Sequence, residues 1–192
     1  MEIYNHNPII YIVCGKARHG KDTVAGMIRE ICEEKGLKTI NLQYSSYIKE
    51  YAKKISNWDG SEETKPRELL QKLGTEVIRQ NIDYLFFVKN ICNDIRVYSY
   101  FFDIITISDS RFKVEVDIPR ENFDRVVAIH IERPNFDNGL TEEQKNHPSE
   151  KDLDDYDKYD YRIINDGTLE ELKEKVREIV EKEMMKYEKT NK

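Results

Sequence analysis

The feature that most constrains this chain is an apolar run that ends at a glycine and continues as an amphipathic helix. Residues 9–14 read Ile-Ile-Tyr-Ile-Val-Cys, and Gly15, Gly20 and Lys21 follow with the spacing G-x-x-x-x-G-K. In this pattern the glycines let backbone N–H groups close around phosphate oxygens, and the lysine reaches the same anion. The helix that begins at Lys21 points the positive end of its dipole there. The stretch therefore predicts a strand, a phosphate-binding loop and a helix in succession.

One position departs from the general pattern. The residue after the lysine, normally a Ser or Thr that binds Mg²⁺, is Asp22, and Thr23 lies one position later, about 100° around the helix. We expect ATP phosphates on this loop and Mg²⁺ beside Asp22. A strand-to-helix turn that merely contains glycines is the alternative, but the isoleucine-rich strand before the loop favours the phosphate site. The predicted nucleotide-binding residues are Gly15, Lys16, Ala17, Arg18, His19, Gly20, Lys21, Asp22 and Thr23.

Charge and composition narrow the class of protein. The 192 residues carry 31 Lys and Arg against 37 Asp and Glu, a net charge of −6, whereas nucleic-acid-binding surfaces show a basic excess. The three cysteines are scattered and lack C-x-x-C spacing, which indicates reduced, buried thiols. The sequence shows no secretory signal and no run of 18 apolar residues, so we expect a cytoplasmic protein with neither a nucleic-acid nor a membrane partner.

Apolar periodicity divides the chain into alternating strands and helices, which predicts a doubly wound α/β sheet. A helix that begins near Pro66 contains Gly74, where glycine costs about 1 kcal/mol relative to alanine. Either that helix breaks at Gly74 or another group approaches the backbone closely. Thr168 and Glu171 form a capping box at the start of the last helix. The expected strands are 9–14, 38–43, 103–109, 126–131 and 160–165, and the other expected helices are 21–35, one from about 46, and 85–97.

Further motifs follow the loop in order. The loop itself contains Gly-Lys-Asp-Thr at 20–23, and a later segment reads Arg67-x-x-Leu-Gln-x-x-Gly-Thr-Glu-x-x-Arg79. Residues 109–115 read Asp-x-Arg-Phe-x-x-Glu directly after an expected strand, and residues 147–150 read His-Pro-Ser-Glu. From Ile9 to about Val180, these motifs together resemble the phage-type deoxynucleoside monophosphate kinases, which are related to the animal-type phosphomevalonate kinases.

The resemblance implies a P-loop kinase fold, with three α/β/α layers around a five-stranded parallel sheet. It implies one domain over 1–192, with an acceptor-binding helical insert at about 44–100 and a lid at about 133–160. The expected reaction is transfer of the γ-phosphoryl group of ATP to a nucleoside monophosphate, with Mg²⁺ bridging the donor phosphates. The active site is expected at the carboxyl ends of the strands.

The resemblance also assigns roles to individual side chains. Arginine suits phosphate binding because its planar fork donates two hydrogen bonds at once. Lys21, Arg111 and a lid arginine, Arg133, are the predicted catalytic residues, and Asp22 and Asp109 are the predicted metal ligands. The roles of Asp109, His147 and Glu150 stay open, although His147 has no second His or Cys at metal-ligand spacing. The predicted acceptor-binding residues are Arg67, Gln71, Gly74, Thr75, Arg79, Asp109 and Arg111.

Two alternative functions remain at this stage. A phosphomevalonate kinase would share the Gly-Lys-Asp loop and the His-x-Ser-Glu segment but would use a small isoprenoid phosphate. A nucleotide-binding regulatory protein is the other alternative, although the guanine-reading sequence N-K-x-D is missing. Residues 44–46 depart from the kinase pattern Phe-Ala-x-x-Leu-Lys, of which only Lys49 aligns. The sequence therefore leaves open the base, the sugar and the oligomeric state, a homodimer being one option.

Overall fold

Five parallel strands form the centre of the structure, a computed structural model that describes residues 3–190. Their order across the sheet is β2-β3-β1-β4-β5, and all four neighbouring pairs are parallel. The α/β fold with a five-stranded parallel sheet, expected from the sequence, is confirmed. The strands are β1 (Ile9–Cys14), β2 (Thr39–Leu42), β3 (Ile104–Ser110), β4 (Val126–Glu132) and β5 (Tyr161–Ile164).

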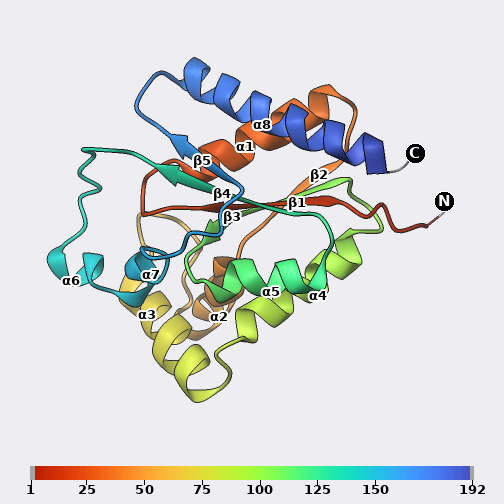
Figure 1. Cartoon of the computed structure of the whole chain (residues 1–192). Helices are drawn as coiled ribbons and strands as arrows, with labels where there is room; N and C mark the ends of the chain where they lie inside the picture. The colour runs from red at the N-terminus through yellow and green to blue at the C-terminus, as the bar shows by residue number, and fades with distance from the viewer. Residues whose placement is uncertain (1–2, 191–192) are drawn as a thin grey trace.

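Helices cover both faces of this sheet. Helices α1 (Lys21–Glu34) and α8 (Leu169–Thr190) lie on one face, and α4 (Phe86–Tyr98) and α5 (Val114–Asn122) lie on the other (Figure 1). The central strand β1 is buried along its whole length, and successive side chains of a strand point to opposite faces. Tyr11 and Val13 accordingly pack in the cluster of α1 and α8, whereas Ile10 and Ile12 pack in that of α4 and α5. Burial on both faces explains why the first strand is an unbroken apolar run.

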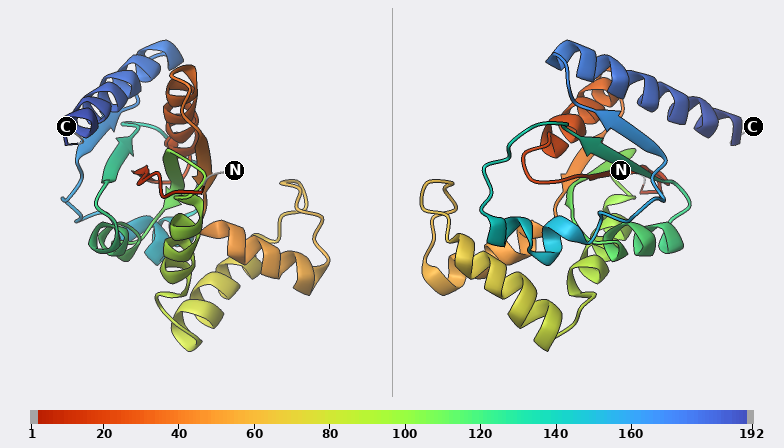
Figure 2. Two further views of the ribbon diagram at one scale, coloured as in Figure 1. Left: turned by 90° about the vertical axis from the view of Figure 1, so that its right-hand side faces the viewer. Right: turned by 60° about the vertical axis from the view of Figure 1, so that its left-hand side comes forward.

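A helical segment between β2 and α4 projects away from the sheet in both views of Figure 2. It contains α2 (Ser45–Ser56), α3 (Arg67–Lys72) and the π-helix η1 (Leu73–Gln80), and a small cluster of Ala52, Trp58 and Leu73 forms its own core. The helix expected from Pro66 thus changes its winding just before Gly74. A Cβ atom at Gly74 would lie 3.0 Å from Cδ1 of Ile48, so α2 approaches the backbone closely there.

The polar stretch between β4 and β5 contains two short helices, α6 (Glu142–Lys145) and α7 (Pro148–Lys151). Side chains from this polar stretch itself cap the N-terminus of each helix. Thr141 and Gln144 form a reciprocal capping box at α6, and His147 accepts the Ser149 N–H at the start of α7. We call residues 133–160 the lid segment. The capping bonds explain how a segment this polar can form helices at all.

The sequence analysis located the strands to within about two residues but missed helix α5 and the two short helices of the lid segment. Helix α5 begins inside the Asp-x-Arg-Phe-x-x-Glu motif and contains Pro119, so its local pattern is not helical. The capping box of α8 is confirmed: Thr168 N–H donates to Glu171, and Glu171 N–H donates to Thr168 Oγ1.

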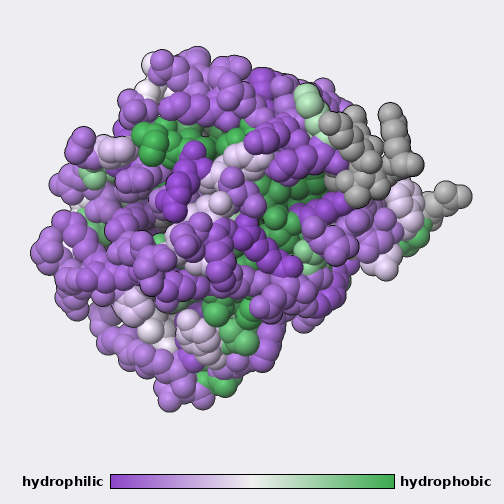
Figure 3. Space-filling view, in the orientation of Figure 1, coloured by the Kyte–Doolittle hydropathy of each residue, from purple (hydrophilic) through white to green (hydrophobic). Residues whose placement is uncertain are grey.

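Within residues 3–190, no helix has both the length and the apolar character needed to cross a membrane. Hydrophilic residues cover most of the face in Figure 3.

Candidate active site

The loop between β1 and α1 lies at the carboxyl edge of the sheet, where ligands bind in open α/β folds. Two glycines in it have backbone conformations that other residues rarely adopt: φ is +149° at Gly15 and +106° at Gly20. A Cβ atom on Gly15 would lie 2.4 Å from the carbonyl oxygen of Ile131, and one on Gly20 would lie 3.0 Å from Nδ2 of Asn165. The loop path therefore needs glycine at both positions, in agreement with the sequence pattern.

Lys21, the first residue of α1, turns its side chain back to this loop. Its Nζ donates hydrogen bonds to the carbonyl oxygens of Gly15 and Lys16, both at 2.8 Å, and the side chain is buried. Burial lowers the pKa of Lys21 to about 7, and the positive charge of Arg111 acts in the same direction. An anion at the loop would favour the charged form of this lysine.

Side chains of the loop hold the start of the lid segment. Arg18 Nη1 donates to the carbonyl oxygen of Asn138 at 2.7 Å, and His19 Nδ1 accepts the N–H of Arg133 at 3.2 Å. Burial lowers the pKa of His19, and the charge of Lys21 adds to this effect, which favours the neutral ring whose Nδ1 can accept a hydrogen bond. The loop and the beginning of the lid segment are thus joined directly.

All seven predicted acceptor-binding residues line a single cavity of about 520 Å³, which we call the acceptor cavity. Its volume lies within the range of small-molecule sites. Ala17 and Asp22 of the phosphate loop line the same cavity, so the two predicted halves of the site meet. The seven are Arg67, Gln71, Gly74, Thr75, Arg79, Asp109 and Arg111.

Arg79 is the most enclosed of these side chains, at 8% exposed. Its Nη2 donates to Glu115 Oε1 at 2.5 Å, and its Nη1 donates to the carbonyl oxygen of Tyr84 at 3.2 Å. The guanidinium carbon lies 4.0 Å from the centre of the Phe112 ring and 5.1 Å from that of Phe87. Arg79 is therefore held in one orientation at the wall of the cavity.

The other two arginines are held less firmly. Arg111 is 28% exposed, and its Nη1 donates to Glu150 Oε1 of the lid segment. Burial lowers the pKa of Arg111 without bringing it near neutrality, because an arginine remains charged in proteins. Arg67 is 67% exposed and lies 3.4 Å from a carboxylate oxygen of Glu62. Of the three, Arg67 is the freest to move.

The two predicted metal ligands have different surroundings. Both oxygens of Asp109 accept backbone N–H bonds at 2.9 Å, from Tyr44 and from Ser45, so this carboxylate positions the start of α2. Asp22 is exposed, and its Oδ1 accepts only a long 3.4 Å bond from Gln43 Nε2 among the contacts described. Thr23 is exposed as well. Asp22 is therefore the carboxylate with free oxygens beside the loop.

The donor set fits Mg²⁺ rather than a metal held by protein alone. Among residues 3–190, no group of three or more His, Cys, Asp and Glu side chains is placed to hold a metal ion. Mg²⁺ typically keeps several waters and is bound through one or two carboxylates together with substrate phosphates. One free carboxylate next to a phosphate-binding loop matches that requirement.

Arg133 lies in a second cavity, of about 670 Å³, on the lid side of the phosphate loop. Lys16 and His19 line this cavity too, and the guanidinium carbon of Arg133 lies 4.0 Å from the centre of the Phe136 ring. Arg133 is not among the residues that line the acceptor cavity. Arg111 and Arg133, both predicted to be catalytic, thus line different cavities.

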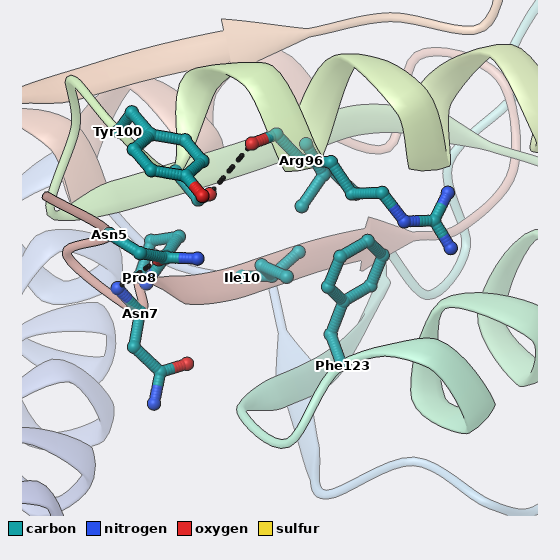
Figure 4. A pocket seen from close by; sticks show the side chains of 9 residues that line it. Asn5, Asn7, Pro8, Ile10, Arg96, Tyr100 and Phe123 are labelled. Carbon is teal, nitrogen blue, oxygen red and sulfur yellow. Dashed lines mark hydrogen bonds between the residues drawn. The ribbon is translucent and has the colours of Figure 1, made fainter.

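Several residues that line the acceptor cavity were not singled out from the sequence. They come from the connection between β2 and α2, from α4, and from residues before and within α6, and nothing in their local patterns marks them; among them are Gln43, Phe87, Leu140 and Gln144. A smaller cavity of about 240 Å³, lined by Pro8, Arg96, Tyr100 and Phe123, lies at the opposite edge of the sheet (Figure 4). Because it is remote from the phosphate loop, it is no part of this site.

Comparison with known proteins decides the family. A model of the deoxynucleotide monophosphate kinase family matches residues 30–176, which is most of the chain. The chain belongs to the deoxynucleotide monophosphate kinase family. The resemblance inferred from the motifs is thereby confirmed, whereas the relation to phosphomevalonate kinases stays a prediction. The family match begins after the phosphate loop and includes α2, η1, α5 and the lid segment.

A curated relative carries the same family name. The deoxynucleotide monophosphate kinase of Enterobacteria phage T4 is 28% identical to this chain over 161 residues. The match covers 83% of this chain and 60% of the phage protein, so the chain spans about three fifths of that relative's length.

Solved structures agree on the fold. An APS kinase from Mycobacterium tuberculosis in complex with AMPPNP and APS has a TM-score of 0.55 at 11% identity, over 91% of this chain and 98% of that chain. A shikimate kinase from Bacteroides thetaiotaomicron has a TM-score of 0.53 at 12% identity, over 90% of this chain and 98% of that chain. At this identity the likeness shows the P-loop kinase fold alone.

Proposed function

We propose that this protein is a kinase that transfers the γ-phosphoryl group of ATP to a deoxynucleoside monophosphate, giving the diphosphate and ADP. Family membership supports this proposal, and one observation carries it. The phosphate loop and the arginines Arg67, Arg79 and Arg111 border the same acceptor cavity, which is large enough for a nucleotide. A donor phosphate on the loop would lie beside an acceptor phosphate on the arginines, as in-line transfer requires.

The roles of the residues follow from the charge that phosphoryl transfer must neutralise. Lys21 and the backbone N–H groups of the loop bind the donor phosphates. Arg67, Arg79 and Arg111, which line the acceptor cavity, bind the acceptor phosphate. Mg²⁺, held through Asp22, supplies further neutralisation of the donor phosphates when bound.

The lid segment completes the donor side of the proposed site. Arg133 lines the second cavity with Lys16 and His19, so we assign it to the donor nucleotide rather than to the acceptor. Asp109 acts on the acceptor side by positioning the start of α2 through the two N–H bonds that it accepts. Closure of the lid segment over the donor would exclude water from the transferring group.

An assay of ADP release tests this function. The protein is incubated with ATP and Mg²⁺ and, in turn, with each ribo- and deoxynucleoside monophosphate and with phosphomevalonate. We expect at least one deoxynucleoside monophosphate to raise ADP release well above the rate with ATP alone. If phosphomevalonate raises ADP release and no nucleoside monophosphate does, the protein acts as a phosphomevalonate kinase instead. Binding of ATP without transfer to any acceptor would favour a regulatory protein.

A further inference from the structure

Glu115 connects two of the arginines in the acceptor cavity. Its side chain is 2% exposed; Oε1 accepts the bond from Arg79 Nη2, and Oε2 accepts the backbone N–H groups of Arg111 at 2.7 Å and Phe112 at 3.1 Å. We propose that Glu115 is the positioning residue that sets Arg79 and Arg111 at the distance and orientation needed to bind the acceptor phosphate. This inference rests on the proposed function of the cavity.

The first part of this role concerns the side chain of Arg79. An arginine has five N–H donors, and the contacts to Glu115 and Tyr84 use two of them. Phe112 packs against the flat face of the guanidinium. Glu115 therefore fixes one edge of the planar fork and leaves other donors for a ligand in the cavity that Arg79 lines.

The second part concerns the backbone that carries Arg111. The two N–H groups on Oε2 belong to consecutive residues at the turn between β3 and α5. Their bonds close this turn and so set the direction in which the Arg111 side chain leaves it. The carbonyl oxygen of Glu115 accepts the hydroxyl of Tyr44 at 2.8 Å, which joins the same point to the start of α2. One carboxylate thus connects η1, the β3–α5 turn and α5.

Stability alone is a poor explanation for this arrangement. Taking a carboxylate and a guanidinium out of water costs several kcal/mol per ion, and well-packed apolar residues often replace such pairs without loss. The Glu115 pair is therefore expected to affect ligand binding beyond its effect on folding. A merely structural pair would change the unfolding temperature and leave the response to an acceptor phosphate unchanged.

The test measures the rise in unfolding temperature caused by inorganic phosphate in the presence of saturating ADP, because a ligand that binds the folded state raises that temperature. The variants are Glu115→Gln and, as a matched control, Glu121→Gln, which lies exposed on the same helix. Phosphate is expected to stabilise the parent and the control but not Glu115→Gln, while ADP stabilises all three. With a turned-over acceptor, Glu115→Gln is expected to raise KM about tenfold or more with nearly unchanged ATP affinity.

A shorter carboxylate keeps the test decisive if Glu115→Gln does not fold. Glu115→Asp keeps a buried charge for Arg79 but shortens the side chain by one methylene group, so it is expected to fold yet show a weaker stabilisation by phosphate than the parent. A full phosphate response in either variant would overturn the inference, and so would a parent protein that phosphate does not stabilise. If the responses follow the expected pattern but no nucleoside monophosphate is phosphorylated, the inference stands and the proposed function fails.

Discussion

The phosphate loop and the three arginines of the acceptor cavity, Arg67, Arg79 and Arg111, which we call the arginine wall, are both proposed to bind phosphate groups but are built differently. The loop uses the backbone of seven consecutive residues, 15–21, and its shape depends on two glycines at positive φ. The arginine wall uses side chains from separate elements, and one buried carboxylate, Glu115, accepts hydrogen bonds from the Arg79 side chain and from the backbone N–H of Arg111. Substitutions that add side-chain volume should therefore destabilise the loop, whereas substitutions that remove a buried charge should destabilise the arginine wall.

Loss of a charge from the wall should have the largest effect on folding. Arg79→Ala leaves Glu115 buried without its partner, and breaking such a pair typically costs about 3–5 kcal/mol. Arg67→Ala is the matched control, because this exposed arginine should change the free energy of unfolding by only about 0.5 kcal/mol or less. Chemical denaturation at pH 8 measures both. Equal effects in the two variants would contradict the contrast between the buried and the exposed arginine.

The cost of Arg79→Ala should also depend on pH. In the parent, burial raises the pKa of Glu115 from 4.5 to about 7, against the attraction of Arg79. Removing Arg79 raises that pKa further, so the folded variant holds a proton that the unfolded chain releases above pH 4.5. Its stability should therefore fall as pH rises above about 4.5. The parent shares this fall in stability up to its own pKa of about 7, so the penalty of Arg79→Ala should grow only as pH rises above about 7. A penalty that is constant between pH 5 and pH 8 would contradict this account.

Added volume in the loop should have the next largest effect. Gly15→Ala places a Cβ atom against the carbonyl oxygen of Ile131 and forces a strained φ, which together should cost about 2–4 kcal/mol. Gly26→Ala is the control, since no atom lies within 4 Å of its added Cβ in helix α1. It should stabilise the protein by up to about 1 kcal/mol. Thermal and denaturant unfolding report both values, and a destabilised Gly26→Ala would show that helix α1 tolerates no added methyl group.

The charge of Lys21 offers a smaller, pH-dependent test of the loop. Because its pKa is lowered to about 7, ATP binding above that pH must first restore a proton to the side chain. We expect the ATP affinity to fall between pH 7.5 and pH 9, approaching tenfold per unit. Calorimetry in buffers of different ionisation enthalpy should detect the proton taken up. A Lys21→Arg variant, whose side chain is charged throughout this pH range, should bind ATP without taking up a proton. If the parent takes up no proton when it binds ATP, Lys21 does not have the lowered pKa on which this prediction rests.

The smallest effect is expected at Asp22. A carboxylate beside the donor phosphates is favourable only while a cation stands between them. Asp22→Ser should therefore bind ATP several-fold more tightly than the parent in EDTA, while its affinity in excess Mg²⁺ changes less and kcat falls. Titration calorimetry under both conditions compares the two proteins. An identical metal dependence would remove Asp22 from the metal site and leave it a helix-start residue.

Local patterns accounted for much of the fold. Apolar runs located the five strands, and the glycine spacing located the phosphate loop, because backbone conformation there depends on residues close in sequence. Helix α5 escaped prediction since Pro119 interrupts its pattern, and its helical state depends on packing against α4 and on Glu115 bonding the turn before it. The change of winding before Gly74 likewise appears only where α2 meets η1.

The sequence by itself determined the order of the five strands along the chain, the helices α1, α2, α4 and α8, the glycine-built loop and the set of arginines available for an acceptor. Only the tertiary structure decided how each arginine is held. Arg79 of η1 and Glu115 of α5 stand 36 residues apart in the sequence and meet only in the folded protein, while Arg133 follows β4 and lines the second cavity. A backbone site is encoded locally because neighbouring residues build it. A side-chain site is decided by which elements the sheet order places together.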